Sequence, residues 1–274
     1  MAWVSHMHLP VQKEEHNMNR SLSLLLASLL LVFTLTACGG TEAPEETSSH
    51  RLKVVATVFP AYDFARAAAG ELADVTLLLP PGTESHSYEP TPADILAVQD
   101  CDLFLYLGGE SDTWVDTILD AVDMRGTAMR MVDCVELLEE ETVEGMQEEP
   151  GHDHEHEHED EDHEDHDHGL GEVVGMDEHV WTAPGNAAAI TRAIGERLSA
   201  LDEGCGDTYR SAAEGYAEKL EGLDREFTEF FAEDRGSMVF GDRFPLRYFA
   251  EEYGVRCLAA FPGCSTQTEP SAAT

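Results

Sequence analysis

The residues of this chain best suited to chemistry are histidines that alternate with acids. They occupy the segment "GHDHEHEHEDEDHEDHDHG", which runs from Gly151 to Gly169. The histidines of the segment are His152, His154, His156, His158, His163, His166 and His168. Imidazole nitrogen and carboxylate oxygen both bind divalent cations, and imidazole favours zinc over manganese. The pattern predicts an auxiliary metal-binding loop, with a merely solubilising acidic loop as the alternative.

This segment lies in a low-complexity insert, 143–176, that is rich in Glu, His, Asp and Gly. Such a composition cannot bury enough apolar surface to build a core, so we expect an exposed accessory. The letters from His154 to His158 match H-E-x-x-H, but that metalloprotease motif needs both histidines on one face of a helix. An alternating polar run is a poor helix. The sequence contains no G-x-S-x-G, P-loop or G-x-G-x-x-G motif.

Two histidines outside the insert are stronger candidates for a defined site. His86 lies in "LPPGTESHSYEPTPAD", a Pro- and Gly-rich stretch that follows a predicted strand, and His179 lies in "MDEHVWTAP", directly after the insert. Loops at the carboxyl ends of parallel strands are where open α/β sheets bind ligands. Each histidine is therefore a candidate ligand, against the alternative of an ordinary surface or hydrogen-bonded histidine. His50 falls in a polar linker and is expected to be inert.

Strands and helices alternate in the part of the chain that must position these histidines. Apolar runs at 52–58, 74–80, 102–109 and 128–135 predict buried strands, and the segments 62–70, 91–100 and 111–122 have helical patterns. Continuous apolar strands separated by helices indicate a parallel sheet that is covered on both faces. The fold class is therefore α/β.

The second half of the chain predicts two further helices and a new sheet. A helix starts near Pro184, and a long helix spans 207–234 with its apolar residues on one broad face. A strand–helix–strand unit then follows at 237–242, 245–254 and 255–261. Because few residues remain after it, we expect a second lobe that is incomplete in this sequence.

The charge of the chain indicates the class of partner. Its 55 acidic residues against 16 basic ones give a formal net charge of −39. Such a surface repels nucleic acid and attracts cations.

The N-terminal segment predicts export. An apolar run from Ser21 to Ala37 follows Arg20 and ends at Cys38, which fits a signal peptide better than a spanning helix. The letters "LTAC" resemble a bacterial lipoprotein signal, in which the cysteine is lipidated, and Met18 is the expected true start. Five cysteines then remain, of which Cys101 and Cys134 form a candidate disulfide.

Two motifs resemble a known family. The stretches "PPGTESHSYEPTPADI" and "DEHVWTAPGNA" are similar to those of the metal-binding lipoproteins of bacterial zinc and manganese ABC importers. The resemblance implies two α/β lobes with parallel sheets, joined by a long rigid helix at 207–232, and one metal ion in the cleft between them. It also implies that His86 and His179 are metal ligands.

The sequence departs from the family pattern in the second lobe. The family places a His or Glu ligand ahead of a Tyr-Phe helix, where this chain has "GDRFPLRYF" and thus Arg243. A guanidinium is always protonated and cannot coordinate a metal. Asp242 is the guessed substitute. Cys264 and Glu269 are further candidates, and the last ligand of the family would fall beyond Thr274.

The expected organisation has five parts. They are a signal peptide (1–37), a lipidated cysteine with its linker (38–51), a metal-binding lobe with the insert (52–205), a connecting helix (206–234) and the start of a second lobe (235–274).

The expected function is that of an extracytoplasmic receptor, a lipid-anchored monomer and not an enzyme, that delivers Zn²⁺ to an ABC permease and its ATPase. One alternative is a zinc-buffering or adhesin-like lipoprotein, and another is manganese or iron as cargo. A further alternative is an extracellular metallohydrolase. It would need a general base near His86, for which Glu84 and Glu178 are candidates by residue type alone.

Overall fold

The computed structural model describes residues 51–83, 85, 88–109, 112–146, 175–233 and 236–263. The residues from Arg51 onward form one compact unit. Several predicted features lie outside the described residues: the signal segment, Cys38, Glu84, His86, the seven histidines of the insert, Cys264 and Glu269.

The first sheet contains four parallel strands in the order β2-β1-β3-β4. The strands are β1 (Leu52–Ala56), β2 (Ala73–Leu77), β3 (Leu103–Tyr106) and β4 (Thr127–Arg130). All four residues of β3 are buried, as expected for a central parallel strand with both faces covered. Strand β2 lies on one side of β1, and β4 lies on the opposite side of β3, so the two connections run in opposite directions across the sheet. The strand order therefore reverses between β1 and β3.

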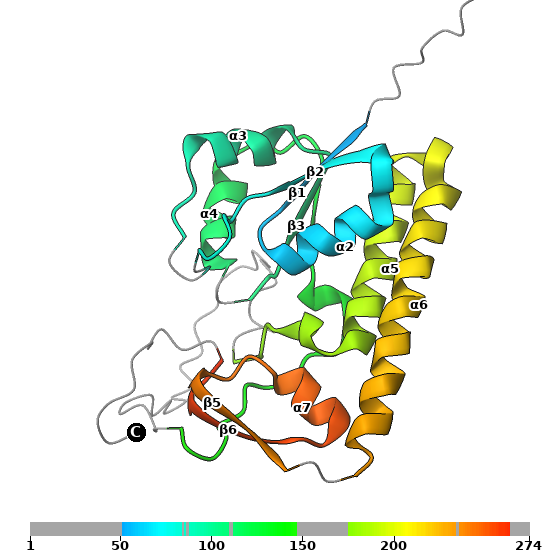
Figure 1. Ribbon diagram of the computed structural model, residues 1–274. Helices are drawn as coiled ribbons and strands as arrows, with labels where there is room; N and C mark the ends of the chain where they lie inside the picture. The colour runs from blue at the N-terminus through cyan, green and yellow to red at the C-terminus, as the bar shows by residue number, and fades with distance from the viewer. Residues whose placement is uncertain are drawn as a thin grey trace, which may run out of the picture. The chain divides into compact units, whose positions relative to one another are not determined.

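Helices cover both faces of this sheet (Figure 1). Successive residues of a strand point to opposite faces. Val54 and Leu105 accordingly join the core beneath α2, α5 and α6, whereas Val55 and Phe104 join the core beneath α3 and α4. The helices are α2 (Phe59–Ala69), α3 (Pro92–Asp100), α4 (Thr113–Ala121), α5 (Pro184–Leu201) and α6 (Gly206–Phe231).

The long helix α6 packs along α5. Its 26 residues span about 39 Å at the usual rise per residue. The two helices approach closely at Gly195, where a Cβ atom would lie 2.5 Å from the Cβ of Ala213. On the exposed side Arg192 pairs with Glu214 and Glu221, both at 2.7 Å. The close contact and the ion pairs hold α6 in register with α5.

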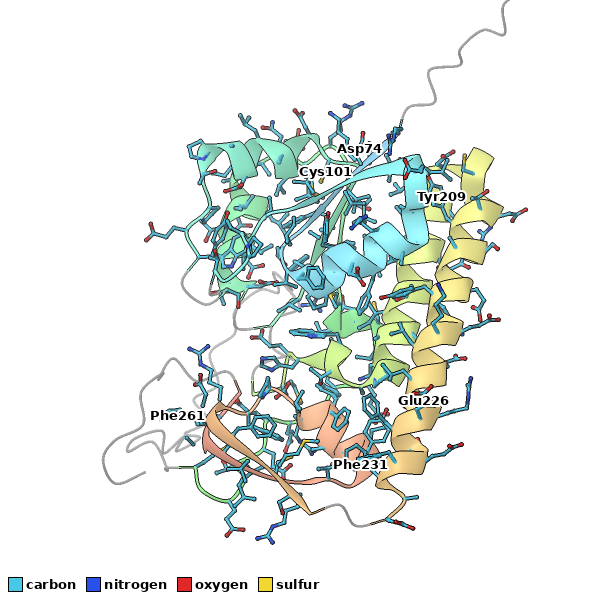
Figure 2. All side chains as sticks on the ribbon, in the orientation of Figure 1. Asp74, Cys101, Tyr209, Glu226, Phe231 and Phe261 are labelled. Atoms are coloured by element: carbon cyan, nitrogen blue, oxygen red, sulfur yellow. The ribbon has the colours of Figure 1, made fainter. Side chains whose placement is uncertain are left out.

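A second, two-stranded sheet lies at the C-terminal part of α6. Strands β5 (Ser237–Arg243) and β6 (Arg256–Phe261) are parallel and are connected by α7 (Arg247–Tyr253). Aromatic rings fix α7 to α6, since Phe227 and Phe231 both contact Phe249 and Tyr253. Figure 2 shows Phe231 at this junction.

The two described ends of the predicted insert are packed, which corrects the expectation that 143–176 is exposed throughout. Val143 and Met146 pack against the core of the second sheet, and Glu144 forms a parallel bridge with Leu258 of β6. At the other end, Met176 forms an antiparallel bridge with Glu139. These methionine and valine side chains supply the apolar surface for this packing, although most residues around them in the sequence are polar.

The candidate disulfide between Cys101 and Cys134 is not formed, and both thiols are free. Cys101 precedes β3, whereas Cys134 follows β4 (Figure 2 labels Cys101). Because the two strands are parallel, the start of one and the end of the other lie at opposite edges of the sheet. Four strand residues span about 13 Å, while bridged cysteines need Cα atoms within about 7 Å. Each Sγ donates instead to a local carbonyl, of Val98 and Arg130 respectively.

The predicted α/β class, the parallel sheets and the long helix are confirmed by the structure. No helix within the described ranges combines the length and the apolar character that crossing a bilayer demands.

Candidate functional site

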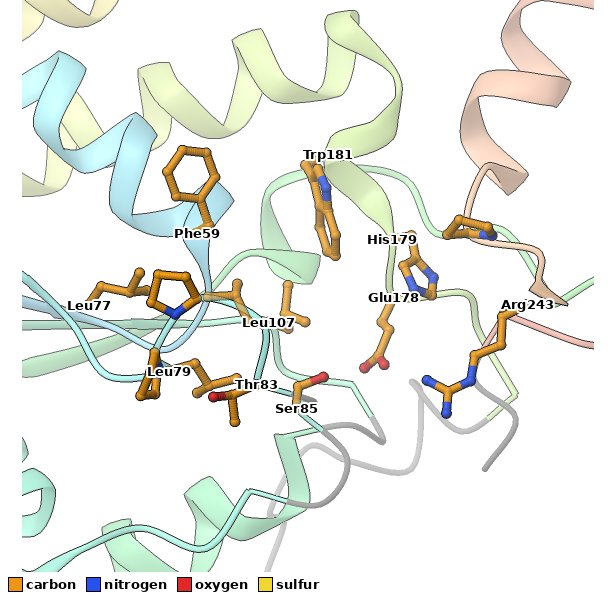
Figure 3. Close-up of a pocket in the computed structure, with 16 residues that line it drawn as sticks. Phe59, Leu77, Leu79, Thr83, Ser85, Leu107, Glu178, His179, Trp181 and Arg243 are labelled. Carbon is orange, nitrogen blue, oxygen red and sulfur yellow. The ribbon is translucent and has the colours of Figure 1, made fainter. Parts of the chain in front are cut away.

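The candidate site is a pocket of about 450 Å³ at the carboxyl edge of the first sheet (Figure 3). Val58, Leu79 and Leu107 line it, and they follow the ends of β1, β2 and β3 respectively. The pocket thus sits where the strand order reverses, the position at which open α/β sheets bind ligands. Its opposite wall comes from the second sheet, where Arg243 ends β5 and Gly263 follows β6. Both sheets therefore contribute to one pocket.

The segment 177–179 carries the polar side chains on one wall of this pocket. Asp177 is 1% exposed, and its Oδ1 accepts a hydrogen bond of 2.8 Å from the backbone N–H of His179. Aspartate commonly forms this local turn, in which its side chain accepts a hydrogen bond from the backbone N–H two residues later. The backbone N–H of Asp177 donates to Leu138 O, and its carbonyl accepts from the Tyr248 hydroxyl at 2.7 Å. The segment is held by both its backbone and its side chains.

His179 is oriented by Asp177. Its Nδ1 lies 3.1 Å from Oδ1 of Asp177. A carboxylate can only accept, so Nδ1 carries the proton and Nε2 keeps its lone pair for a ligand. Burial disfavours the protonated ring, but the hydrogen bond to Asp177 and the charges of Asp177, Glu178 and Glu140 outweigh it and raise the pKa of His179. The same hydrogen bond makes Nε2 more basic and therefore a better donor to a metal ion.

Neighbouring groups hold the ring of His179 in place. The indole of Trp181 lies 5.5 Å away between ring centroids, and the hydroxyl of Thr182 donates to the carbonyl of His179 at 2.8 Å. Gly263 approaches from the second sheet so closely that a Cβ there would lie 3.3 Å from Cε1. His179 therefore sits at the junction of the two sheets.

Glu178 also lines the pocket, although it is only 2% exposed. Figure 3 shows its carboxylate in the same region of the pocket as Ser85 and Arg243. It occupies space that Gly109 leaves open: a Cβ at position 109 would lie 2.1 Å from its Oε2. A buried carboxylate thus accompanies the imidazole.

The structure separates Arg243 from Asp242. Arg243 lines the pocket, whereas Asp242 is exposed and its Oδ1 accepts from the backbone N–H of Arg243 at 2.9 Å. A register irregularity between Phe240 and Arg243 interrupts the regular alternation of β5, and Asp242 is left exposed while Arg243 lines the pocket. The structure therefore does not bring Asp242 together with His179.

The predicted ligands are only partly within the described structure. His179 lines the pocket, while His86 and the histidines of the insert lie outside the described residues. Ser85, the residue before His86, does line the pocket. Among the described residues, no group of three His, Cys, Asp or Glu is placed to surround a metal ion. The described donors on the pocket wall are the imidazole of His179 and the carboxylate of Glu178.

Four contributors to the site were not predicted in these roles from the sequence. Asp177 could have been identified, because an aspartate two residues before a histidine is a recurrent turn. Glu178 was considered only as a catalytic base. Tyr248 and Gly109 carried no local signal, since they reach the site only through packing.

The chain matches the model of a protein family over residues 54–274, and the family is described as zinc-uptake complex component A, periplasmic. The zinc-binding lipoprotein AdcA of Streptococcus pneumoniae is 33% identical over 254 residues, which are 93% of this chain and 46% of that protein. The high-affinity zinc uptake system protein ZnuA of Bacillus subtilis is 32% identical over 92% of this chain and 74% of its own length. This chain spans about half the length of the AdcA relatives, 46% in each case.

Solved structures share the fold. The Zn(II)-bound ZnuA-like domain of S. pneumoniae AdcA has a TM-score of 0.61 and 31% identity, covering 81% of this chain and 71% of that domain. The metal-dependent lipoprotein YcdH of B. subtilis has a TM-score of 0.61 and 26% identity, with the same coverage of 81% and 71%. With the match over residues 54–274, these relatives show that the chain belongs to the family of periplasmic zinc-uptake components A.

Proposed function

We propose that this chain is an extracytoplasmic zinc receptor that binds Zn²⁺ in the pocket between its two sheets and delivers it to an ABC importer. The observation that carries the proposal is the pair Asp177–His179, in which a buried carboxylate orients an imidazole on the pocket wall. Zinc-binding histidines are commonly oriented in this way. The names of the relatives, zinc-binding lipoprotein and high-affinity zinc uptake protein, support the same cargo.

His86 is the proposed second ligand. The chain lines the pocket from Leu77 to Ser85 with few interruptions, and His86 follows directly in the sequence. Two imidazoles favour zinc, which binds nitrogen at about 2.0–2.1 Å, over manganese, which prefers sites rich in carboxylates. Zinc is therefore the proposed cargo, with manganese and iron as the alternatives.

The insert is proposed to collect zinc for this pocket. Its C-terminal end is anchored by the bond from Glu140 N to Gly175 O, and Gly175 is four residues before His179. Seven histidines tethered at this point raise the local concentration of bound cation beside the pocket. A protonated imidazole cannot bind metal, so we expect collection to weaken as the pH falls through the histidine range.

The remaining parts of the proposal concern the location and the partners. Cys38 is the proposed site of lipidation, which would anchor a monomeric receptor to the outer face of the bacterial cytoplasmic membrane. The partners would be a permease and its ATPase. The two-lobe organisation, with α6 as the connection, would let the pocket open without unfolding either sheet.

A chelator-competition zinc titration tests the proposal. It uses the full chain, a variant in which the seven insert histidines are changed to Asn, and His179→Ala in that second background. We expect one tight ion that persists without the insert histidines and disappears with His179→Ala. If tight binding vanishes with the insert histidines alone, the chain is a zinc buffer, and the receptor proposal fails.

A further inference from the structure

The described residues of the second sheet form a wall of the pocket without offering a metal-binding side chain. Arg243, Pro245 and Gly263 line the pocket from this side. A guanidinium is always protonated, and proline and glycine have no side-chain donor atom, so none of these three side chains can coordinate a cation. A displacement of this wall therefore removes none of the described ligands, and any effect on the bound ion has to pass through other contacts.

The helix that follows this wall reaches the core of the first sheet. Pro245 lies on the wall, and α7 begins two residues later at Arg247. Tyr248, the second residue of α7, is 3% exposed and belongs to the same buried cluster as Val180. Val180 follows His179 directly in the sequence. Tyr248 thus connects the second wall of the pocket with the segment that carries His179.

The hydroxyl of Tyr248 binds two backbone segments at once. It donates to the carbonyl of Asp177 at 2.7 Å and accepts from the N–H of Leu138 at 3.2 Å. Asp177 and Leu138 are also bonded to each other, since the N–H of Asp177 donates to the carbonyl of Leu138 at 2.9 Å. One hydroxyl from α7 therefore completes a set of three hydrogen bonds around the backbone of the residue that orients His179.

The residue before Tyr248 strengthens this attachment. Nε of Arg247 donates to the carbonyl of Glu139 at 3.3 Å, and Nη1 of Arg247 lies 3.4 Å from the carboxylate of Glu141. Glu139 in turn forms an antiparallel bridge with Met176. The start of α7 is therefore bonded to the pair of segments that leads into the pocket wall.

The other end of α7 is attached to α6. Phe249 and Tyr253 contact Phe227 and Phe231, and the hydroxyl of Tyr253 donates to Asp224 at 2.6 Å. The helix thus has two separate attachments, one to the backbone of the pocket wall and one to α6. Each attachment uses one tyrosine hydroxyl, so the two tyrosines of α7 offer a matched comparison.

We propose that Tyr248 couples the docking of α7 to metal binding by His179. Asp177 orients the ring that binds the ion, and Tyr248 holds the backbone of Asp177. Coupling between two sites is reciprocal, so a bound ion stabilises the docked α7, and a displaced α7 weakens the hold on the ion. The second sheet and its helix thereby act on the ion through the orientation of a ligand from the first sheet. This inference rests on the proposed zinc-receptor function.

Amide hydrogen exchange of α7 with and without saturating zinc tests the coupling. The experiment uses the full chain with the seven insert histidines changed to Asn. We expect zinc to slow exchange in Arg247–Tyr253 by about fivefold or more, the lower end for coupled sites. Tyr248→Phe should reduce this zinc effect to less than about twofold, whereas Tyr253→Phe should keep it.

The ratio of the two rates separates coupling from a structural role. A hydroxyl that only stabilises α7 leaves exchange faster after its removal in both the zinc-free and the zinc-bound chain, and the ratio stays the same. A Tyr248→Phe variant with the ratio of the parent therefore overturns the inference. Chelator competition gives the reciprocal measurement, in which we expect Tyr248→Phe to bind zinc about fivefold or more weakly and Tyr253→Phe to bind as the parent does.

Zinc titration in the same background distinguishes this inference from the proposed function. If one tight ion is found and is lost in His179→Ala, but exchange in α7 of the parent does not respond to zinc, the inference fails alone. If no ion depends on His179, the proposed function fails and the inference fails with it.

Discussion

Oδ1 of Asp177 accepts two hydrogen bonds from His179, one from its backbone N–H at 2.8 Å and one from Nδ1 at 3.1 Å. The two bonds fix both the turn and the orientation of the ring. They also decide which nitrogen is available, because Nδ1 carries the proton and Nε2 keeps its lone pair.

Asp177→Asn is expected to weaken zinc binding by about 10- to 100-fold, the range for groups that orient metal ligands. The amide has nearly the same shape, but it lacks the charge that makes the ring a better donor. Chelator competition measures the effect in the background without the insert histidines. Asp133→Asn is the matched control, because it breaks an exposed ion pair with Arg130 and neither residue lines the pocket. Equal affinity of the Asp177→Asn variant and the parent would exclude the orienting role.

Gly109→Ala is expected to lower both stability and zinc affinity. The new methyl group would meet the buried side chain of Glu178 at 2.1 Å. Overpacking of this kind costs about 1–3 kcal/mol. Gly215→Ala on α6 is the matched control, since a Cβ there meets nothing within 4 Å. It should stabilise the helix by up to about 1 kcal/mol and leave zinc binding unchanged. Denaturant unfolding and zinc titration of both variants give the comparison, and identical behaviour would contradict the packing argument.

Tyr248→Phe is expected to destabilise the chain by about 1–3 kcal/mol and to weaken zinc binding. Its hydroxyl donates to the carbonyl of Asp177 at 2.7 Å and accepts from the N–H of Leu138 at 3.2 Å. Without it, both backbone groups lose a partner, and the segment that carries His179 is less well held. Tyr253→Phe removes one hydroxyl bond to Asp224 and should affect stability only. The prediction fails if both variants bind zinc equally tightly.

The raised pKa of Asp112 predicts that the stability of the zinc-free chain depends on pH. Its Oδ2 accepts from the backbone N–H of Leu107 at 2.6 Å, but burial and the charge of Glu178 raise its pKa from 3.8 to about 7. Between these values the folded chain holds a proton that the unfolded chain has released. Stability therefore falls as the pH rises from about 4 to about 7 and then levels off.

Asp112→Asn cannot titrate and should remove this contribution. The variant gains stability relative to the parent across the same window, by at most about 4 kcal/mol. Denaturant unfolding at a series of pH values measures the difference between the two profiles. Parallel profiles would show that Asp112 is ionised in the folded chain throughout.

Most of the elements could be predicted because their signals are local. The apolar run of β1, the proline that starts α5 and the long apolar face of α6 are readable within a few turns of chain. The predicted strands extended too far at their carboxyl ends. Leu78 and Leu79 are buried although β2 ends at Leu77, since the loop itself packs into the core. An apolar residue indicates burial, but it does not distinguish a strand from a buried loop.

The α/β class, the long helix and His179 as a candidate ligand are readable from the sequence, because periodicity and motif spacing depend on neighbours along the chain. Which side chains meet depends on contacts that form only in the folded chain. The parallel arrangement of β3 and β4 keeps Cys101 away from Cys134, and the irregularity between Phe240 and Arg243 in β5 leaves Arg243 on the pocket wall and Asp242 exposed. The pocket that holds Glu178 beside His179 is closed by residues from both sheets, and contacts between such distant parts of the chain leave no local pattern to read.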